Sequence, residues 1–155
     1  KDRSLDVFIA PAKEYLNDYP GKIVVPVDLA YEKSGQRCEV MVKDLPVNEM
    51  FMDIGSKTIE IFKKIIESAG TIFVNGPAGA YENKLFEKGT KEIWNAIADA
   101  KGYSVIGGGD TVSAASRFID TKKINYVCTA GGAMVRFLSG KNLPLIQAMK
   151  KASRK

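Results

Sequence analysis

Three glycine-rich segments, each lying between a short apolar run and a helical pattern, most constrain the fold of this 155-residue chain. They cover residues 75–82, 107–111 and 129–133. Strands of about four to six residues that alternate with longer helices predict βαβ units and a parallel sheet. The loops that follow the strands of such a sheet all lie at its carboxyl edge, where ligands bind. We therefore expect the three segments to be neighbours in space and to share one ligand site.

The periodicity of the apolar residues predicts the elements around these segments. Strands are expected over residues 23–27, 37–42, 71–74, 103–106 and 124–128. Helices are expected over residues 12–18, 57–68 (with Ser56 as the cap), 89–101, 112–119, 133–138 and from 144 onward. The pattern as a whole indicates an α/β fold, a layered sandwich whose parallel sheet carries helices on both faces.

The composition excludes several classes of protein. The chain has no histidine, which excludes Ser-His-Asp and Cys-His catalysis. Cys38 and Cys128 lie far apart and form no CxxC motif, so we expect neither a disulfide framework nor a zinc site, and a cytoplasmic setting. No apolar run is long enough to span a bilayer, and no signal-peptide pattern opens the chain. A membrane partner is therefore not expected.

The formal net charge of +5 is mild, because 23 basic residues face 18 acidic ones. The basic residues are spread along the chain except near its end, which carries Lys150, Lys151, Arg154 and Lys155. No aromatic residues alternate with these charges, so we interpret them as a solvated tail and expect no nucleic-acid partner.

The segment at 107–111 reads Gly-Gly-Gly-Asp-Thr and precedes a helix that the pattern opens at Val112. Glycines let the backbone turn sharply and approach a ligand, and the amino end of a helix attracts phosphate. Neither the GxxxxGK[ST] motif nor the GxGxxG motif is present. Asp110 would repel a bare phosphate, so either it holds a magnesium ion that binds the phosphates or it only caps the helix. The spacing leaves both interpretations open.

Two polar residues frame the segment at 75–82. Glu82 would suit the ribose hydroxyls of a nucleotide, although a glutamate in such a place is more often a plain surface residue. Asn75 could donate to a phosphate oxygen or merely tolerate the geometry of the turn. Trp94 falls in the apolar stripe of a helix, and Cys128 has no base to activate it, so we expect both to pack in the core.

Together these segments resemble a known family. The run Val-Asn-Gly-Pro-Ala-Gly-Ala-Tyr-Glu at 74–82 resembles the W-N-G-P-x-G-x-F-E segment of phosphoglycerate kinases. The stretch at 104–111 is similar to their nucleotide-phosphate loop, and residues 129–144 look like their closing T-G-G-G-A…L-x-G-K-x-L-P. Pro-Val-Asp at 26–28 and Met-Asp-Ile-Gly at 52–55 have counterparts in the right order. The resemblance runs from about residue 10 to the end, and Val-Asn-Gly-Pro-Ala-Gly at 74–79 suggests the archaeal branch.

The resemblance implies a function and a set of site residues. Members of the family transfer a phosphoryl group between 1,3-bisphosphoglycerate and ADP with magnesium, in glycolysis and gluconeogenesis. By position, the residues implied to bind nucleotide are Met52 and Ala80 (walls of the adenine slot), Glu82 (ribose), Asn75, Gly107, Gly108, Gly109, Asp110 and Thr111 (phosphates, with Asp110 on Mg²⁺). Those implied to present N–H groups to the transferring phosphoryl group are Ala130, Gly131 and Gly132.

The departures from the family pattern bear on activity. The family's N-terminal domain, which binds the glycerate, has no counterpart here, and neither does the G-G-A-K-V-x-D-K segment that supplies phosphate-binding lysines. Val74 replaces a tryptophan, and Ala130 replaces a glycine. We therefore interpret residues 1–155 as an incomplete, Rossmann-like C-terminal nucleotide-binding domain of a phosphoglycerate kinase, inactive alone. Its expected partners are ADP or ATP, phosphoglycerate and the absent domain. The alternative is a non-catalytic nucleotide-binding module.

Overall fold

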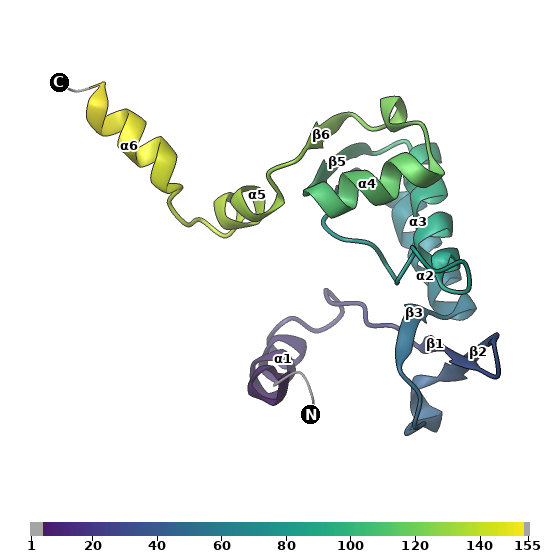
Figure 1. Ribbon diagram of the computed structural model, residues 1–155. Coiled ribbons are helices and arrows are strands. Elements are labelled where there is room, and N and C mark those ends of the chain that lie inside the picture. Colours follow the sequence, from purple (N-terminus) through teal and green to yellow (C-terminus); the bar gives the residue numbers. More distant parts are fainter. Residues whose placement is uncertain (1–4, 154–155) are drawn as a thin grey trace.

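The computed structural model describes residues 5–153, which form two three-stranded sheets (Figure 1). The first sheet is antiparallel with the order β2-β1-β3, and its strands are β1 (Asp28–Lys33), β2 (Gln36–Met41) and β3 (Phe51–Ile54). The second is parallel with the order β4-β5-β6, and its strands are β4 (Thr71–Val74), β5 (Tyr103–Gly107) and β6 (Tyr126–Cys128). The predicted α/β fold with a parallel sheet is confirmed, and the antiparallel sheet is an addition that the sequence pattern did not predict.

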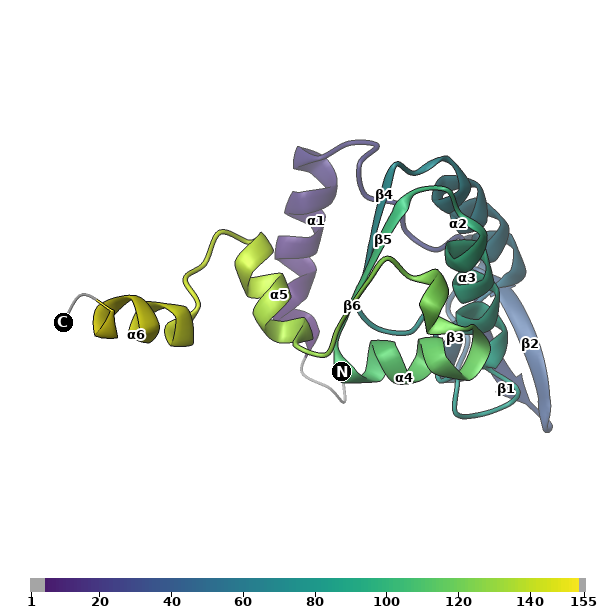
Figure 2. The same cartoon turned by 90° about the horizontal axis from the view of Figure 1, so that it is seen from above.

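Helices flank the parallel sheet, as predicted. The helices of the described residues are η1 (Leu5–Phe8), α1 (Ile9–Asp18), η2 (Val42–Asp44), α2 (Ser56–Ser68), α3 (Glu87–Asp99), α4 (Gly109–Phe118), η3 (Thr121–Lys123), α5 (Gly131–Leu138) and α6 (Pro144–Ala152). Figure 2 shows α2, α3 and α4 on one side of the sheet and α5 on the other, while α6 extends away from the body. Within residues 5–153, no helix has the length and apolar character needed to cross a membrane.

One predicted strand is wrong. Residues 23–26 are irregular, and the first strand begins only at Asp28. The β-branched run there suits a strand, but a strand also needs a neighbour to pair with, and Pro26 has no N–H to donate. Ile23, Val24 and Val25 are all exposed. The chain instead forms a hairpin of β1 and β2, whose turn residues Ser34 and Gly35 have positive φ angles of 53° and 76°.

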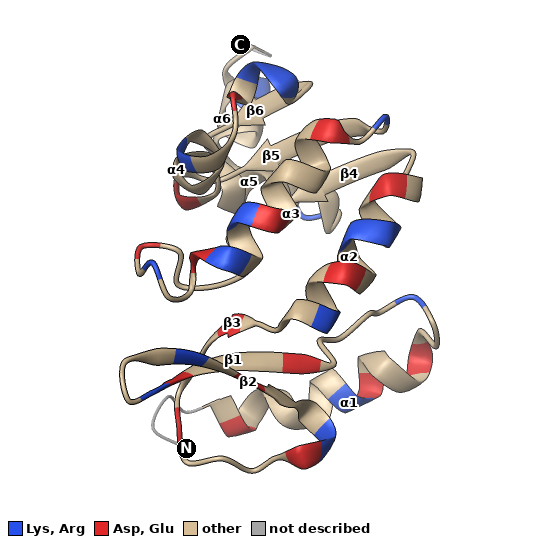
Figure 3. Cartoon of the chain, turned by 90° about the vertical axis from the view of Figure 1, so that its right-hand side faces the viewer, with Lys and Arg blue, Asp and Glu red and all other residues tan. Residues whose placement is uncertain are grey.

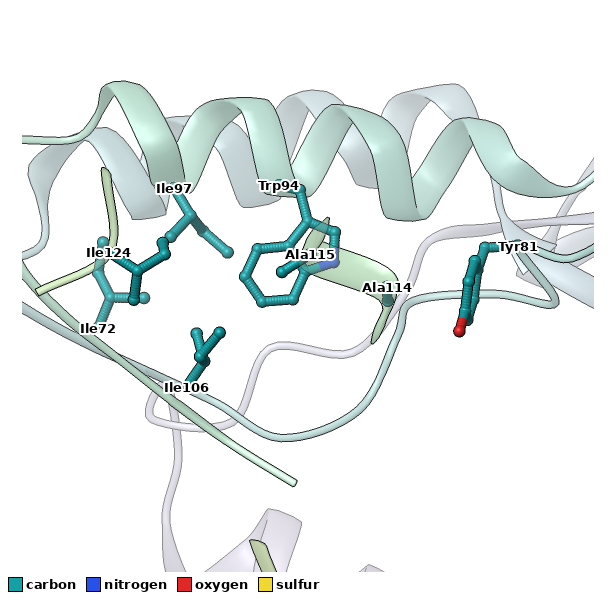
Figure 4. Close-up of a cluster of buried hydrophobic side chains, with 8 residues drawn as sticks. All are labelled: Ile72, Tyr81, Trp94, Ile97, Ile106, Ala114, Ala115 and Ile124. Carbon is teal, nitrogen blue, oxygen red and sulfur yellow. The ribbon is translucent and has the colours of Figure 1, made fainter. Parts of the chain in front are cut away.

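The core lies between the parallel sheet and α3 and α4 (Figure 4). Trp94 on α3 is 1% exposed and lies near Ile106 of β5 and near Ala115 of α4, so its predicted place in the core is confirmed. Ala114 and Ala115 are fully buried, and their small side chains let α4 approach the sheet closely. This packing fixes the amino end of α4 at the end of β5.

Charges of both signs are interspersed along α2 and α3, as Figure 3 shows. Lys63 on α2 pairs with Glu92 on α3 at 3.2 Å. The basic residues expected in a solvated tail are partly helical, since Lys150 and Lys151 are exposed on α6. Arg154 and Lys155 lie outside the described residues.

Candidate functional site

The three glycine-rich segments meet at the carboxyl edge of the parallel sheet. The N–H of Gly108 donates to the carbonyl of Cys128 at 2.9 Å, and this bond joins the second segment to the strand before the third. A Cβ added to Gly131 would lie 2.7 Å from the Cα of Gly108, so the backbones of these segments are in contact. The N–H of Gly76 donates to Oγ1 of Thr111 at 2.7 Å, and this bond joins the first segment to the second. The expectation that the three segments are neighbours is confirmed.

Two helices begin at this junction. Helix α4 starts at Gly109 and α5 at Gly131, and the N–H groups of a first helical turn have no acceptor within the helix. The two helix dipoles add positive potential at their amino ends. A Cβ added to Gly109 or Gly132 would meet nothing within 4 Å, so this side of the junction is open. Converging helix termini with an open face form a site that suits an anion such as phosphate.

Asp110 lies in the first turn of α4, and its residue is exposed. The residue that caps the helix is Gly108, with a φ of 106°, so the capping interpretation of Asp110 does not describe how this helix begins. No cluster of three or more His, Cys, Asp or Glu in residues 5–153 could hold a metal ion by itself. A single exposed carboxylate beside the open amino ends of two helices fits Mg²⁺, which commonly uses one or two carboxylates together with phosphate oxygens.

The family assignment agrees with this geometry. The family model of phosphoglycerate kinase matches residues 2–141. The chain belongs to the phosphoglycerate kinase family. It is 46% identical over 142 residues to the phosphoglycerate kinase of Methanopyrus kandleri, with 92% of the chain and 35% of that protein covered. It is 43% identical over 148 residues to that of Methanothermus fervidus, with 96% and 36% covered. These relatives are archaeal, in agreement with the resemblance of residues 74–79.

Solved phosphoglycerate kinases show the same fold. The crystal structure of the enzyme from Pyrococcus horikoshii OT3 matches with a TM-score of 0.87 at 33% identity, covering 99% of the chain and 39% of that structure. The structure from Coxiella burnetii matches with a TM-score of 0.83 at 34% identity, covering 92% and 38%. The chain thus spans about a third of the length of the curated relatives that it matches.

The phosphate-binding residues that the phosphoglycerate kinase resemblance implies are not equally accessible. Gly109 and Asp110 are exposed. Gly107 is buried at the end of β5, and the N–H of Gly108 already has the carbonyl of Cys128 as acceptor. Thr111 is 1% exposed, and its hydroxyl oxygen accepts from the N–H of Gly76. The side chain of Thr111 therefore joins two segments of the site.

The implied donors of the third segment fall into two groups. Gly131 and Gly132 open α5, and their N–H groups belong to its first turn. The N–H of Ala130 instead faces Sγ of Cys128 at 3.4 Å. Ala130 has a φ of −90°, which alanine adopts without strain, and this explains why the family glycine can be replaced here. Cys128 is half-buried against this turn.

The implied nucleoside residues lie on the first segment and on β3. Glu82, implied to bind the ribose, is exposed, and so is Asn75, implied to bind a phosphate, as contact with a ligand requires. The N–H of Ala80 donates to the carbonyl of Met52 at 2.8 Å, so the two implied walls of the adenine slot are adjacent. Met52 also lines a hollow of about 350 Å³ together with Met50 and Phe86.

Two buried carboxylates behind the site were not recognised as such from the sequence. Asp53 is 5% exposed, and its carboxylate pairs with Nη1 of Arg37 at 2.8 Å. Burial raises the pKa of the Asp53 carboxyl, and hydrogen bonds from Gly89 and Arg37 oppose part of this rise. Asp28 is 3% exposed and binds the first turn of α2. An aspartate within an apolar run was the available signal, because buried charges require partners.

Proposed function

We propose that this chain is the nucleotide-binding portion of a phosphoglycerate kinase, acting in the cytoplasm. The whole enzyme would transfer a phosphoryl group reversibly between 1,3-bisphosphoglycerate and Mg-ADP and would yield 3-phosphoglycerate and ATP. The observation that carries this proposal is the convergence of the amino ends of α4 and α5 beside the free carboxylate of Asp110. Residues 1–155 would form the C-terminal domain, with the glycerate side supplied by the rest of the enzyme.

In this proposal the exposed groups hold the nucleotide. The backbone N–H groups of Gly109, Asp110 and Thr111 bind its phosphates, and the carboxylate of Asp110 holds Mg²⁺. Magnesium held there would supply positive charge that offsets the charge of the phosphates. Asn75 would donate to a phosphate, and Glu82 would accept from the ribose hydroxyls. Met52 and Ala80 would line the base.

The N–H groups of Gly131 and Gly132 would face the phosphoryl group in transfer. Donors fixed in this way stabilise the charge of the transition state without having to reorient. The absence of a histidine is compatible with this chemistry, since phosphoryl transfer depends mainly on positioning and charge neutralisation.

The test is a titration of the chain with Mg-ADP and with ADP in EDTA, in the wild type and in Asp110→Asn. We expect the wild type to bind Mg-ADP more tightly than metal-free ADP, and Asp110→Asn to lose about tenfold in affinity for Mg-ADP together with that metal dependence. Asp99→Asn is the matched control, because Asp99 is an exposed aspartate on α3 that pairs with Lys123 at the surface. Equal binding by the wild type and Asp110→Asn, with or without metal, would contradict the proposed site.

A further inference from the structure

The buried ion pair of Arg37 and Asp53 has a geometry that indicates a role besides stabilising the fold. The carboxylate of Asp53 accepts from Nη1 of Arg37 at 2.8 Å, from the N–H of Gly89 at 2.8 Å and from its neighbour Ile54 at 2.9 Å. The side chain of Asp53 is fully buried, and that of Arg37 is 15% exposed. A buried carboxylate held by a guanidinium and two amides is fixed in position and in orientation.

Arg37 also donates hydrogen bonds to other parts of the chain. Its Nη2 donates to the carbonyl of Ile54 at 2.8 Å, and its Nη1 also donates to the carbonyl of Leu85 at 3.1 Å. Its Nε donates to Glu39 at 3.2 Å, and Glu39 in turn accepts from the N–H of Ser56 at the start of α2. One hairpin arginine thus joins β3, the segment before α3 and, through Glu39, the start of α2.

The first glycine-rich segment is packed directly against this pair. A Cβ added to Gly79 would lie 2.3 Å from Oδ1 of Asp53, so the backbone at Gly79 touches the carboxylate. The next residue, Ala80, donates its N–H to the carbonyl of Met52, which is the neighbour of Asp53 on β3. The spacing between Met52 and Ala80 is therefore set by where Arg37 holds Asp53.

The phosphate side of the site is held by other contacts. The second segment is tied to the first through Thr111 and Gly76, and to the third through Gly108 and Cys128. In the described part of the chain, no hydrogen bond of Arg37 or Asp53 reaches residues 107–111 or 129–133. The base side and the phosphate side of the site are thus held by separate sets of hydrogen bonds.

We propose that Arg37 and Asp53 are positioning residues for the base of the nucleotide and determine how strongly the site favours an adenine nucleotide over a bare phosphate chain. This inference rests on the proposed function, since it takes Met52 and Ala80 as the walls of the base slot. Arg37 acts through Asp53 and touches no ligand itself.

The test compares the affinities of the chain for Mg-ADP and for magnesium pyrophosphate, which lacks the base. Arg37→Lys keeps the charge but cannot reproduce the planar fork. We expect it to weaken Mg-ADP binding about tenfold, comparable to the loss of one charge-assisted hydrogen bond, and to leave pyrophosphate binding within about twofold. Thr111→Val serves as the contrast, because it loosens the phosphate side and should weaken both ligands. Lys123→Met, which breaks an exposed ion pair, should change neither.

The outcomes separate the two proposals. A wild-type chain that binds neither ligand overturns the proposed function. A wild-type chain that binds both, with Arg37→Lys weakening both equally or neither, overturns the positioning role. The fluorescence of Trp94, the single tryptophan and a core residue, reports whether each variant is folded. If Arg37→Lys does not fold, Glu39→Ala decides the matter, because it removes the acceptor of Nε of Arg37 and keeps the buried pair. It should weaken Mg-ADP alone by about threefold, and unchanged selectivity refutes the proposal.

Discussion

Asp28 acts as the cap of a helix that begins far along the sequence. Its carboxylate accepts from the N–H groups of Lys57 and Thr58 and from the hydroxyl of Thr58. A Cβ on Gly55 would lie 2.2 Å from Cγ of Asp28, so only glycine fits before this helix. Ser56, the cap predicted from the sequence, instead contacts Glu39. Reasoning from the sequence looks for a cap within a few residues of the start of the helix. It therefore could not find a cap contributed by a distant strand.

The pKa of Asp28 leads to a prediction about acid stability. Burial by itself would raise this pKa, but the hydroxyl of Thr58 and the amides of Lys57 and Thr58 outweigh it and lower the pKa below its usual range. A carboxyl whose pKa is lowered on folding stabilises the protein fully above its unfolded pKa of about 3.9. That contribution is lost as the pH falls through the lowered folded value.

We therefore expect Asp28→Asn to reduce the free energy of unfolding at pH 7 by about 1–3 kcal/mol, as for a lost hydrogen bond to a buried charge. The difference between variant and wild type should shrink below about pH 4. Urea unfolding followed by Trp94 fluorescence at both pH values measures it, with the exposed Asp99→Asn as control. A difference that stays constant with pH would show that the charge of Asp28 is not what stabilises α2.

At the scale of elements, the sequence predicted which segments are helical better than where the helices begin. Helix α4 was expected to open at Val112, but it begins at Gly109. Glycine has a low helix propensity, so the pattern assigned Gly109 to the loop, whereas packing of α4 on the sheet overrides that preference. The earlier start matters for the site, because it places the first-turn amides beside α5. Of the two strands of the β1–β2 hairpin, only the second was expected, at residues 37–42, because the strand before it was placed at residues 23–27.

The close approach of α4 to the sheet gives a prediction for this element. Ala114 is fully buried in the core cluster that contains Trp94 and Tyr81, so a larger side chain has no space there. We expect Ala114→Leu to lower the free energy of unfolding by about 1–3 kcal/mol through overpacking. Ala148→Leu, on the exposed face of α6, is the matched control and should be close to neutral. Chemical denaturation measures both, and equal stabilities would mean that α4 is not tightly packed.

At the scale of the molecule, the parallel sheet of the described residues has an unpaired edge and exposed aromatic residues on one face. Strand β4 pairs with β5 on one edge and with no strand of the described residues on the other. Phe73, Tyr103 and Tyr126 are exposed on one face of the same sheet. Ile23 to Val25 form no strand, although their composition favours one. These features agree with a chain that spans about a third of its relatives.

We expect the chain on its own to have no phosphoglycerate kinase turnover, because the proposed site holds only the nucleotide half of the reaction and lacks the closure of two domains. A coupled assay that follows ADP formation from ATP and 3-phosphoglycerate measures this. The full-length phosphoglycerate kinase of Methanopyrus kandleri, a relative at 46% identity, is the positive control. Turnover clearly above background would contradict the prediction.

The tight turn at Ser34 and Gly35 also has a kinetic consequence. The turn joins two strands that are adjacent in sequence, so paired residues such as Lys33 and Gln36 are close in sequence. In the parallel sheet, paired residues such as Thr71 and Tyr103 are far apart in sequence. Closing a short hairpin takes about 1–10 μs, and pairing across an intervening helix is slower because a longer loop must close first. The β1–β2 hairpin that carries Arg37 and Glu39 should therefore form before the phosphate-binding edge exists, so the base-positioning arginine is already on an ordered strand when the glycine-rich segments arrive.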